Sequence, residues 1–412
     1  MFSLLSWCQK LFSGISSNKN PYEENIQEVS GKSLSPTLGK SSCQFVDGLY
    51  MTANEQVPAM QRAVVTPRKQ KTLNQTMQTI AVQEPTAGEV VDSIFSLSSD
   101  AKSPESNHIA GHEGIGYVVK SYDRSTLGKC VGIRYIGFSC GSCKYCVRGL
   151  STSCPFQQDI PIHHSGTFQQ YVTIPASCLI FFPDGLLEGG IDPALYASAL
   201  CSGSTGLTSL KAASLKPGDV VIVTGIAGGI GHLTGAIAKK VFQAKVIGID
   251  LASKMDTLPQ EWEDYSDIRI SPPVTNHDAD WSTFHSVLLA ACEELRGGQG
   301  VRHGADAIIV TSSSFSSFHR LDRFVCDGGR IICVGVPKGE NMLQIPLRAV
   351  VERNLHLSGN LMGGHEETFE VIELIRMGVI RPFVKKLCLE DVPSHLQDLV
   401  DCRGVGKYVV QV

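Results

Sequence analysis

The sequence lacks the features that mark membrane-spanning and nucleic-acid-binding proteins. Its 412 residues contain no uninterrupted apolar run long enough to cross a bilayer. The 36 basic and 40 acidic residues are dispersed and give a net charge of -4, so no polybasic surface for nucleic acid or anionic lipid is indicated. We therefore expect a protein with no nucleic-acid partner and no membrane partner.

The N-terminal region also lacks arginine, because the first arginine of the chain is Arg62. Mitochondrial transit peptides are rich in arginine and poor in acids, whereas acids begin here at Glu23. A cytoplasmic location is therefore favoured over mitochondrial import. The polar stretch that begins near Ser16 has neither a helical nor a strand period. We predict that residues 1–60 form a disordered extension.

Cysteine is plentiful, and four of the fourteen cysteines lie in one short stretch. Their spacing is C-x2-C-x2-C-x7-C, and the residues are Cys140, Cys143, Cys146 and Cys154. Four thiolates close a tetrahedral shell around Zn²⁺ and leave no position for substrate, which is typical of a structural site. Two disulfides or four unrelated thiols are the alternatives. The other ten cysteines are scattered, which fits a reducing compartment and favours metal over disulfides.

The order of strand and helix patterns divides the chain into three further regions. Residues 61–205 are β-rich and contain many turns. Residues 206–345 alternate buried strands with helices, which predicts a doubly wound parallel sheet and an α/β fold. Residues 346–412 depart from this alternation. Strands are expected at VVIVTG, AKVIGID, 305–312, 329–336 and the final KYVVQV, and helices at 229–242, 285–296, 315–326 and 366–378.

A glycine-rich turn follows the first strand of the alternating region and opens a helix. The turn contains Gly225, Gly228, Gly229 and Gly231. Glycines in this context let the backbone approach a pyrophosphate, whose charge the helix N-terminus attracts. Asp250 ends the next strand, where a carboxylate accepts hydrogen bonds from ribose hydroxyls and favours NAD over NADP. Lys254 is either a second ribose contact or a solvated lysine. A tight turn without a ligand is the alternative for the whole motif.

Taken together, these segments resemble the zinc-containing medium-chain alcohol dehydrogenases, most closely their fungal NAD-dependent branch. The resemblance covers about residues 61–412. It implies a GroES-like β-rich catalytic domain that is interrupted by a Rossmann domain, with the terminal segment returning to the catalytic domain. It also implies an alcohol or carbonyl substrate and a homo-oligomer, either a dimer or a tetramer. The segments that carry it are GHEGIGYVV, GIRYIGFSCGSCKYC, CPFQQDIPIHHSGTFQQYV, GIAGGIG, GID and CVGVPKG.

The resemblance assigns expected roles to individual residues of this chain. His112 and Cys201 match two ligands of a catalytic zinc. Glu113 matches the glutamate beside the histidine ligand, which can exchange with substrate or water at the metal. Tyr135 matches a bulky residue of the alcohol pocket. Lys407 stands where the family often has an arginine near the cofactor phosphates. The residues expected at the nicotinamide are Thr205, Val334, Gly335 and Val336.

The sequence departs from the family where the first catalytic-zinc cysteine is expected. The matching segment is SLSSDAK, and aligning it on Asp100 places Leu97 at the cysteine position. Ser99 then matches the hydroxyl that relays the proton. The stretch from Asp100 to His112 is also shorter than in relatives, and His108 is a possible substitute ligand. Leucine cannot bind zinc, so the completeness of the catalytic site is an open question.

Three functions therefore compete. The leading hypothesis is an NAD-dependent oxidoreductase that interconverts an alcohol and an aldehyde or ketone by zinc-assisted hydride transfer. The second is a zinc-free medium-chain reductase of enones or quinones, which the leucine fits. The third is a catalytically impaired member of the family that still binds NAD.

Overall fold

The computed structural model describes most of the chain beyond Ser42. The described residues are 43–46, 49–52, 57–65, 75–98, 109–274, 277–298, 304–337, 339 and 342–412. The chain divides at Ser42 into two units, and the second unit, Cys43–Val412, is the one described below. The predicted disordered extension therefore lies mostly outside the described residues. Its last part differs from the prediction, because β1 (Cys43–Val46) and β2 (Leu49–Thr52) form an antiparallel hairpin.

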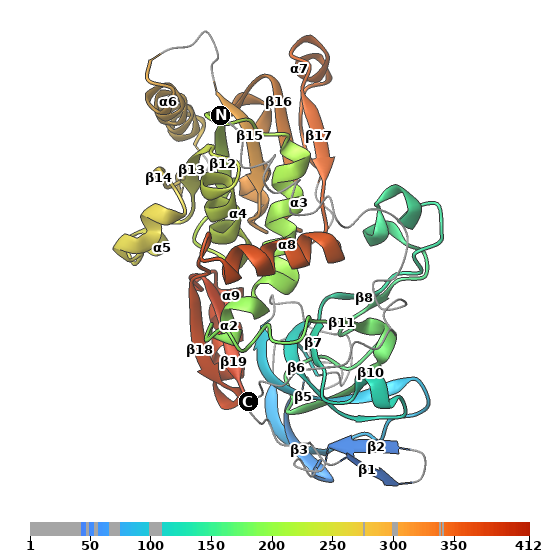
Figure 1. Cartoon of the computed structure of the whole chain (residues 1–412). Coiled ribbons are helices and arrows are strands. Elements are labelled where there is room, and N and C mark those ends of the chain that lie inside the picture. Colours follow the sequence, from blue (N-terminus) through green and yellow to red (C-terminus); the bar gives the residue numbers. More distant parts are fainter. Residues whose placement is uncertain are drawn as a thin grey trace, which may run out of the picture. The chain divides into compact units, whose positions relative to one another are not determined.

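Six parallel strands form the sheet of the alternating region (Figure 1). Their order across the sheet is β14–β13–β12–β15–β16–β17, which is the doubly wound order with its switch point between β12 and β15. The strands are β12 (Val220–Thr224), β13 (Lys245–Ile249), β14 (Ile268–Ile270), β15 (Ala305–Val310), β16 (Val325–Cys333) and β17 (His356–Gly359). The predicted doubly wound sheet is confirmed.

Both faces of this sheet are covered, which explains the continuous apolar run of β12. Val221 and Val223 pack in one core with residues of α3 (Ser204–Ala213) and α4 (Gly229–Lys240). Val220 and Ile222 belong to a second core, to which α6 (Asp278–Leu295) contributes (Figure 1). A strand that is buried on both sides has no polar positions to alternate with its apolar ones.

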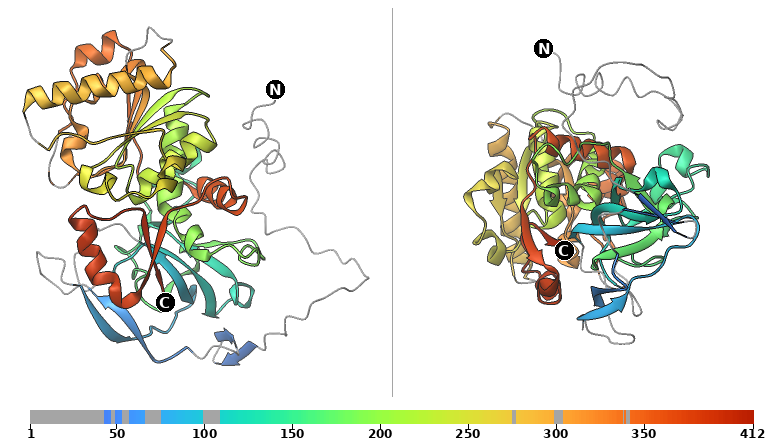
Figure 2. Two further views of the ribbon diagram at one scale, coloured as in Figure 1. Left: turned by 90° about the vertical axis from the view of Figure 1, so that its left-hand side faces the viewer. Right: turned by 60° about the horizontal axis from the view of Figure 1, so that its bottom comes forward.

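A nine-stranded, mostly antiparallel sheet forms the β-rich part of the described chain. The last strand, β19, runs antiparallel to β5 and parallel to β18, so the C-terminal segment returns to this sheet as predicted (Figure 2). The strands besides β1 and β2 are β5 (Glu89–Ser98), β6 (Glu113–Ser121), β7 (Cys130–Ile133), β10 (Tyr171–Pro175), β11 (Leu179–Phe181), β18 (Val384–Cys388) and β19 (Lys407–Gln411). Two smaller pairs are β3 (Met60–Val65) with β4 (Thr76–Ala81), and β8 (Ile136–Phe138) with β9 (Gln158–Asp159).

Two predictions about the alternating region differ from the structure. The helix expected at 315–326 is absent, because two short 3-10 turns at Phe315–Phe318 and Leu321–Arg323 precede β16. Arg320 between them adopts a left-handed conformation with φ of 50°, which a continuous helix does not allow. The boundary at residue 345 also falls too early, because β17 lies beyond it and still pairs with β16.

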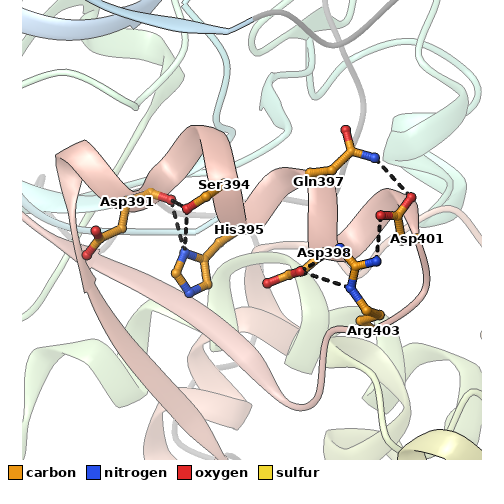
Figure 3. Close-up of polar contacts among 7 residues, drawn as sticks. All are labelled: Asp391, Ser394, His395, Gln397, Asp398, Asp401 and Arg403. Carbon is orange, nitrogen blue, oxygen red and sulfur yellow. Dashed lines mark hydrogen bonds and ion pairs between the residues drawn. The ribbon is translucent and has the colours of Figure 1, made fainter.

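The remaining helices include α9, whose outward side carries a network of polar contacts. Figure 3 shows Arg403 between Asp398 and Asp401, at 3.0 Å and 2.8 Å. Exposed ion pairs of this kind contribute little stability, about 0–1 kcal/mol each. The helices are α2 (Pro193–Ala197), α5 (Ala252–Met255), α7 (Leu347–Glu352), α8 (His365–Arg376) and α9 (Val392–Val400). Within the described ranges, no helix has both the length and the apolar character that crossing a bilayer requires.

Candidate functional site

The glycine turn lies at the carboxyl end of β12, at the switch point of the parallel sheet. Gly225 has φ of 73°, a conformation that side chains disfavour. A Cβ on Gly231 would lie 2.0 Å from the carbonyl oxygen of Gly225, so only glycine allows this close packing of turn and helix. Gly228 is the N-cap of α4 and Gly229 is its first residue. Carboxyl ends of strands at a switch point are where doubly wound sheets bind ligands.

Asp250 follows β13 and is bonded to the glycine turn. One of its carboxylate oxygens accepts the Ala227 N–H at 2.9 Å, and the other accepts the Leu251 N–H at 2.9 Å. The Lys254 ammonium, from α5, lies 3.8 Å from the second oxygen. Asp250 and Lys254 therefore stand together at the edge of the predicted dinucleotide site.

Asn360, which no sequence motif indicated, joins the two segments that carry the residues expected at the nicotinamide. The side-chain amide of Asn360 donates to the carbonyl of Thr205 at 3.1 Å, and its backbone N–H donates to the carbonyl of Cys333 at 2.9 Å. Thr205 on α3 is thereby joined to the end of β16, where Val334 and Gly335 follow. Val334 is buried, whereas Val336 is 58% exposed.

Cys201 lies on a π-helical turn, Ala199–Gly203, immediately before α3. The Gly203 N–H reaches back five residues to the carbonyl of Ser198 at 2.9 Å. The N–H groups of Cys201 and Ser202 instead donate to one oxygen of the Glu113 carboxylate, at 3.1 Å and 3.4 Å. Single π turns inside helices occur frequently at functional sites. Here the wider turn brings two backbone donors to a buried carboxylate.

Lys407 pairs with the second oxygen of Glu113. Its ammonium lies 2.6 Å from that oxygen and donates to the hydroxyl of Ser202 at 2.7 Å. The side chains of Lys407 and Glu113 are 3% and 0% exposed. The Lys407 stem passes the glycine turn, because a Cβ on Gly229 would lie 3.1 Å from its Cδ. Lys407 is thus beside the predicted phosphate site, but its charge is held by Glu113.

An apolar group surrounds the thiol of Cys201. Cys201 packs with Ile136 and Met362, and the half-buried ring of Tyr135 lies against them. The imidazole of His112 meets the Tyr135 ring edge to face, with centroids 5.5 Å apart. The expected pocket residue and two expected metal ligands are therefore neighbours of one small cluster.

A buried arginine lies beside this cluster. Arg134 donates to the carbonyl of Ile136 at 3.3 Å and to the hydroxyl of Thr368 on α8 at 2.9 Å. Burial lowers the pKa of its guanidinium to about 10, although the nearby Cys201 and Glu367 oppose this shift.

The described residues form no second group of three metal ligands. His112, Glu113 and Cys201 do not bring three ligand atoms within 4.8 Å of one another, and both Glu113 oxygens are already bonded. The backbone of Leu97 lies in β5, opposite Gly114 of β6. Ser99, Asp100 and His108 lie outside the described residues, so their predicted roles stay predictions.

The four cysteines of the spaced cluster fit a metal closely. Their sulfurs are separated by 3.5 Å to 4.0 Å in the four pairs that make contact. Sulfurs bound to one zinc ion at about 2.3 Å would lie roughly 3.8 Å apart in a tetrahedron. Backbone N–H groups of Ser142 and Cys143 lower the pKa of the Cys140 thiol to about 6, which favours the thiolate. In the described part of the chain, this is the one such group of metal ligands.

Three residues of the site were not predicted from the sequence: Asn360, Ser202 and His232. His232 on α4 bonds the carbonyl of Gly228 at 2.8 Å, and the roles of Asn360 and Ser202 depend on contacts between distant segments. The one available signal was the position of His232, one residue after the last glycine of the motif.

Comparison with known proteins identifies relatives in sequence. The family described as "Alcohol dehydrogenase GroES-like domain" matches residues 86–184. "Alcohol dehydrogenase 2" of Emericella nidulans is 29% identical over 314 residues, which cover 74% of this chain and 81% of that protein. "Alcohol dehydrogenase" of Geobacillus stearothermophilus is 29% identical over 307 residues, or 74% and 82% of the two chains.

Solved structures of the same fold are also found. Acetophenone reductase from Geotrichum candidum, in complex with NAD, has a TM-score of 0.68 at 21% identity over 87% of this chain and 99% of that one. A cobalt- and zinc-bound thermostable alcohol dehydrogenase from Pyrobaculum aerophilum has a TM-score of 0.69 at 20% identity, over 86% and 100%. At these identities the likeness establishes the fold alone.

The sulfur geometry predicts that the cysteine loop holds zinc. In the variant Cys154→Ser, zinc should be lost because the tetrahedral shell then lacks one thiolate. The matched control is Cys402→Ser, which changes an exposed thiol outside the loop. Metal content after gel filtration, measured by inductively coupled plasma mass spectrometry, checks this. Equal zinc in both variants would contradict the assignment.

The buried ion pair predicts that loss of its lysine destabilises the fold much more than loss of a lysine from an exposed ion pair. Lys407→Met should lower the free energy of unfolding by about 3–5 kcal/mol, because it leaves the Glu113 charge buried without its cation. The double variant with Glu113→Gln should recover part of this loss. Lys129→Met, which breaks the exposed pair with Asp184, should cost at most about 1 kcal/mol. Urea denaturation measures all three, and equal losses in the two lysine variants would refute the prediction.

Proposed function

We propose, for a chain that belongs to the zinc-containing medium-chain alcohol dehydrogenase family, an NAD-dependent activity that interconverts an alcohol and an aldehyde or ketone. The observation that carries the proposal is the glycine turn at the switch point of the sheet, with the Asp250 carboxylate bonded to it. The relatives named as alcohol dehydrogenases support the reaction class. The same fold in a reductase solved with NAD is consistent with the cofactor.

The described residues suit a dinucleotide. The first amides of α4 would face the pyrophosphate, whose charge the helix dipole favours. Asp250 would accept hydrogen bonds from the adenosine ribose and disfavour a 2′-phosphate. Thr205, Val334 and Gly335 would position the nicotinamide, with Asn360 holding the two segments together. When bound, the cofactor itself supplies the chemistry of hydride transfer.

On the substrate side, the cluster around Cys201 provides an apolar surface. Tyr135, Ile136 and Met362 would bind the carbon skeleton of an alcohol or carbonyl compound and exclude water from it. The imidazole of His112 meets the Tyr135 ring of this surface edge to face. Transfer of the proton to solvent by Ser99 remains a prediction.

Whether a catalytic zinc assists the reaction is a separate part of the proposal. The ion pair between Glu113 and Lys407 bears on this question. Because Glu113 is bonded to Lys407 and to two backbone N–H groups, it is poorly placed to act as a ligand. This observation favours the second candidate function, a zinc-free medium-chain reductase of enones or quinones. Metal stoichiometry together with activity distinguishes the two functions.

The test uses the purified full-length protein with NADH and a panel of aldehydes, ketones, enones and quinones. Carbonyl reduction, with zinc bound in addition to the cysteine loop, supports zinc-assisted alcohol dehydrogenase activity. Enone reduction with zinc in the loop alone supports the zinc-free reductase. Binding of NADH without turnover of any compound indicates the catalytically impaired member and overturns the proposed activity.

The cofactor assignment predicts the effect of Asp250→Ala. NADH affinity should fall at least about tenfold, because a charged hydrogen-bond acceptor contributes about 1.5–3 kcal/mol. NADPH affinity should not fall with it, since the repulsion of the 2′-phosphate is removed as well. Fluorescence titration of both nucleotides measures the ratio. An unchanged preference for NADH would contradict the role of Asp250, and Asp219→Ala, which changes a carboxylate before β12, serves as a control.

A further inference from the structure

His232 is a fully buried histidine in the first turn of α4, and both ring nitrogens are bonded. The Phe383 N–H donates to Nε2 at 3.1 Å, so Nε2 carries no proton. Nδ1 must therefore hold the proton of the neutral ring, and it donates to the carbonyl of Gly228 at 2.8 Å. The hydrogen-bond pattern thus determines the tautomer.

The carbonyl of Gly228 receives two donors from the same residue. The backbone N–H of His232 also donates to it, at 3.2 Å, as the first bond of the helix. Because a peptide unit is planar and its C=O and N–H point in opposite directions, fixing this carbonyl also fixes the N–H of Gly229. That N–H is therefore directed away from the helix, beyond its N-terminus.

The other side of His232 is anchored by the returning C-terminal segment. The carbonyl of Phe383 accepts the N–H of Lys407 at 2.9 Å, and Gly406 donates its N–H to the carbonyl of Ala227 at 2.7 Å. Two consecutive carbonyls of the glycine turn, those of Ala227 and Gly228, are thus bonded by groups outside the helical backbone. The ring of His232 is one of the two links between the turn and this segment.

The surroundings keep the ring neutral. The aromatic rings of Trp262 and Tyr265 lie 6.1 Å and 5.4 Å from the imidazole centroid. Burial, together with the nearby Lys407 ammonium, lowers the pKa of His232 to about 4, although the hydrogen bond to the Gly228 carbonyl opposes this shift. At neutral pH the residue is therefore a hydrogen-bonding element without charge.

We propose that His232 is a positioning residue for the dinucleotide, holding the Gly228–Gly229 peptide so that its N–H faces the pyrophosphate. The inference rests on the proposed NAD site at this turn. His232 touches neither cofactor nor substrate in this role and acts through the orientation of one backbone amide.

Two substitutions separate the bonds of the ring. In His232→Asn, the amide nitrogen lies near the place of Nδ1 and can still donate to Gly228. In His232→Gln, the longer amide reaches the place of Nε2 and can keep the Phe383 contact. We expect His232→Gln to weaken NADH and ADP-ribose binding about five- to tenfold, the equivalent of one hydrogen bond. His232→Asn should stay within about twofold of the wild type.

Adenosine monophosphate serves as the internal control, because it has no pyrophosphate and should bind all variants alike. The turnover number of His232→Gln at saturating NADH should be unchanged while the KM for NADH rises. Tyr265→Phe is the matched structural control, since it removes the hydrogen bond from Tyr265 to the Arg381 carbonyl in the same aromatic cluster. Titration calorimetry measures the three ligands.

Four results would overturn the inference. His232→Gln could bind NADH as tightly as the wild type, or His232→Asn and His232→Gln could lose NADH affinity equally. His232→Gln could also weaken adenosine monophosphate as much as NADH, or Tyr265→Phe could lose as much NADH affinity as His232→Gln. Each would indicate general destabilisation or no role. Wild-type protein that binds neither NADH nor ADP-ribose would instead overturn the proposed function, and the inference with it.

Discussion

A carboxylate and an ammonium that are both withdrawn from water must stay together, and three segments of this chain meet because of that requirement. Glu113 begins β6, Lys407 begins β19, and Ser202 belongs to the π-helical turn before α3. Each isolated charge would be costly to bury, whereas the pair with its backbone donors is satisfied. This one contact therefore joins the returning C-terminal strand and the Cys201 turn to the start of β6.

The features that could be predicted from the sequence are those that depend on interactions between residues close together in the chain. The cysteine spacing, the glycine turn and the acid at the end of β13 each depend on residues close together in the chain, and the structure brings each of these groups together as expected. The error at 315–326 arose because apolar spacing in a short segment is also compatible with successive turns. The return of Lys407 to Glu113 could not be inferred, because nothing near either residue indicates its partner.

The described site has two halves of unequal completeness. The half proposed to bind the dinucleotide has a tight turn, an acid and a helix N-terminus in one arrangement. The half proposed to bind the substrate has an apolar surface beside His112 and Cys201, and its carboxylate, Glu113, is paired with Lys407. The proposed activity thus rests on the geometry of the proposed cofactor half, and the chemistry at the carbonyl oxygen is the part on which the candidate functions differ.

The π-helical turn at Ala199–Gly203 makes the site sensitive to chain length as well as to side-chain identity. Each residue in an α-helix advances the direction of the side chain by about 100°. One residue fewer between Ser198 and Ser204 would let the regular ladder close and turn the two N–H groups away from Glu113. Substitutions throughout this turn can preserve its path, but a single deletion cannot. Descendants of this chain could therefore vary the amino-acid identities in this turn more freely than its length.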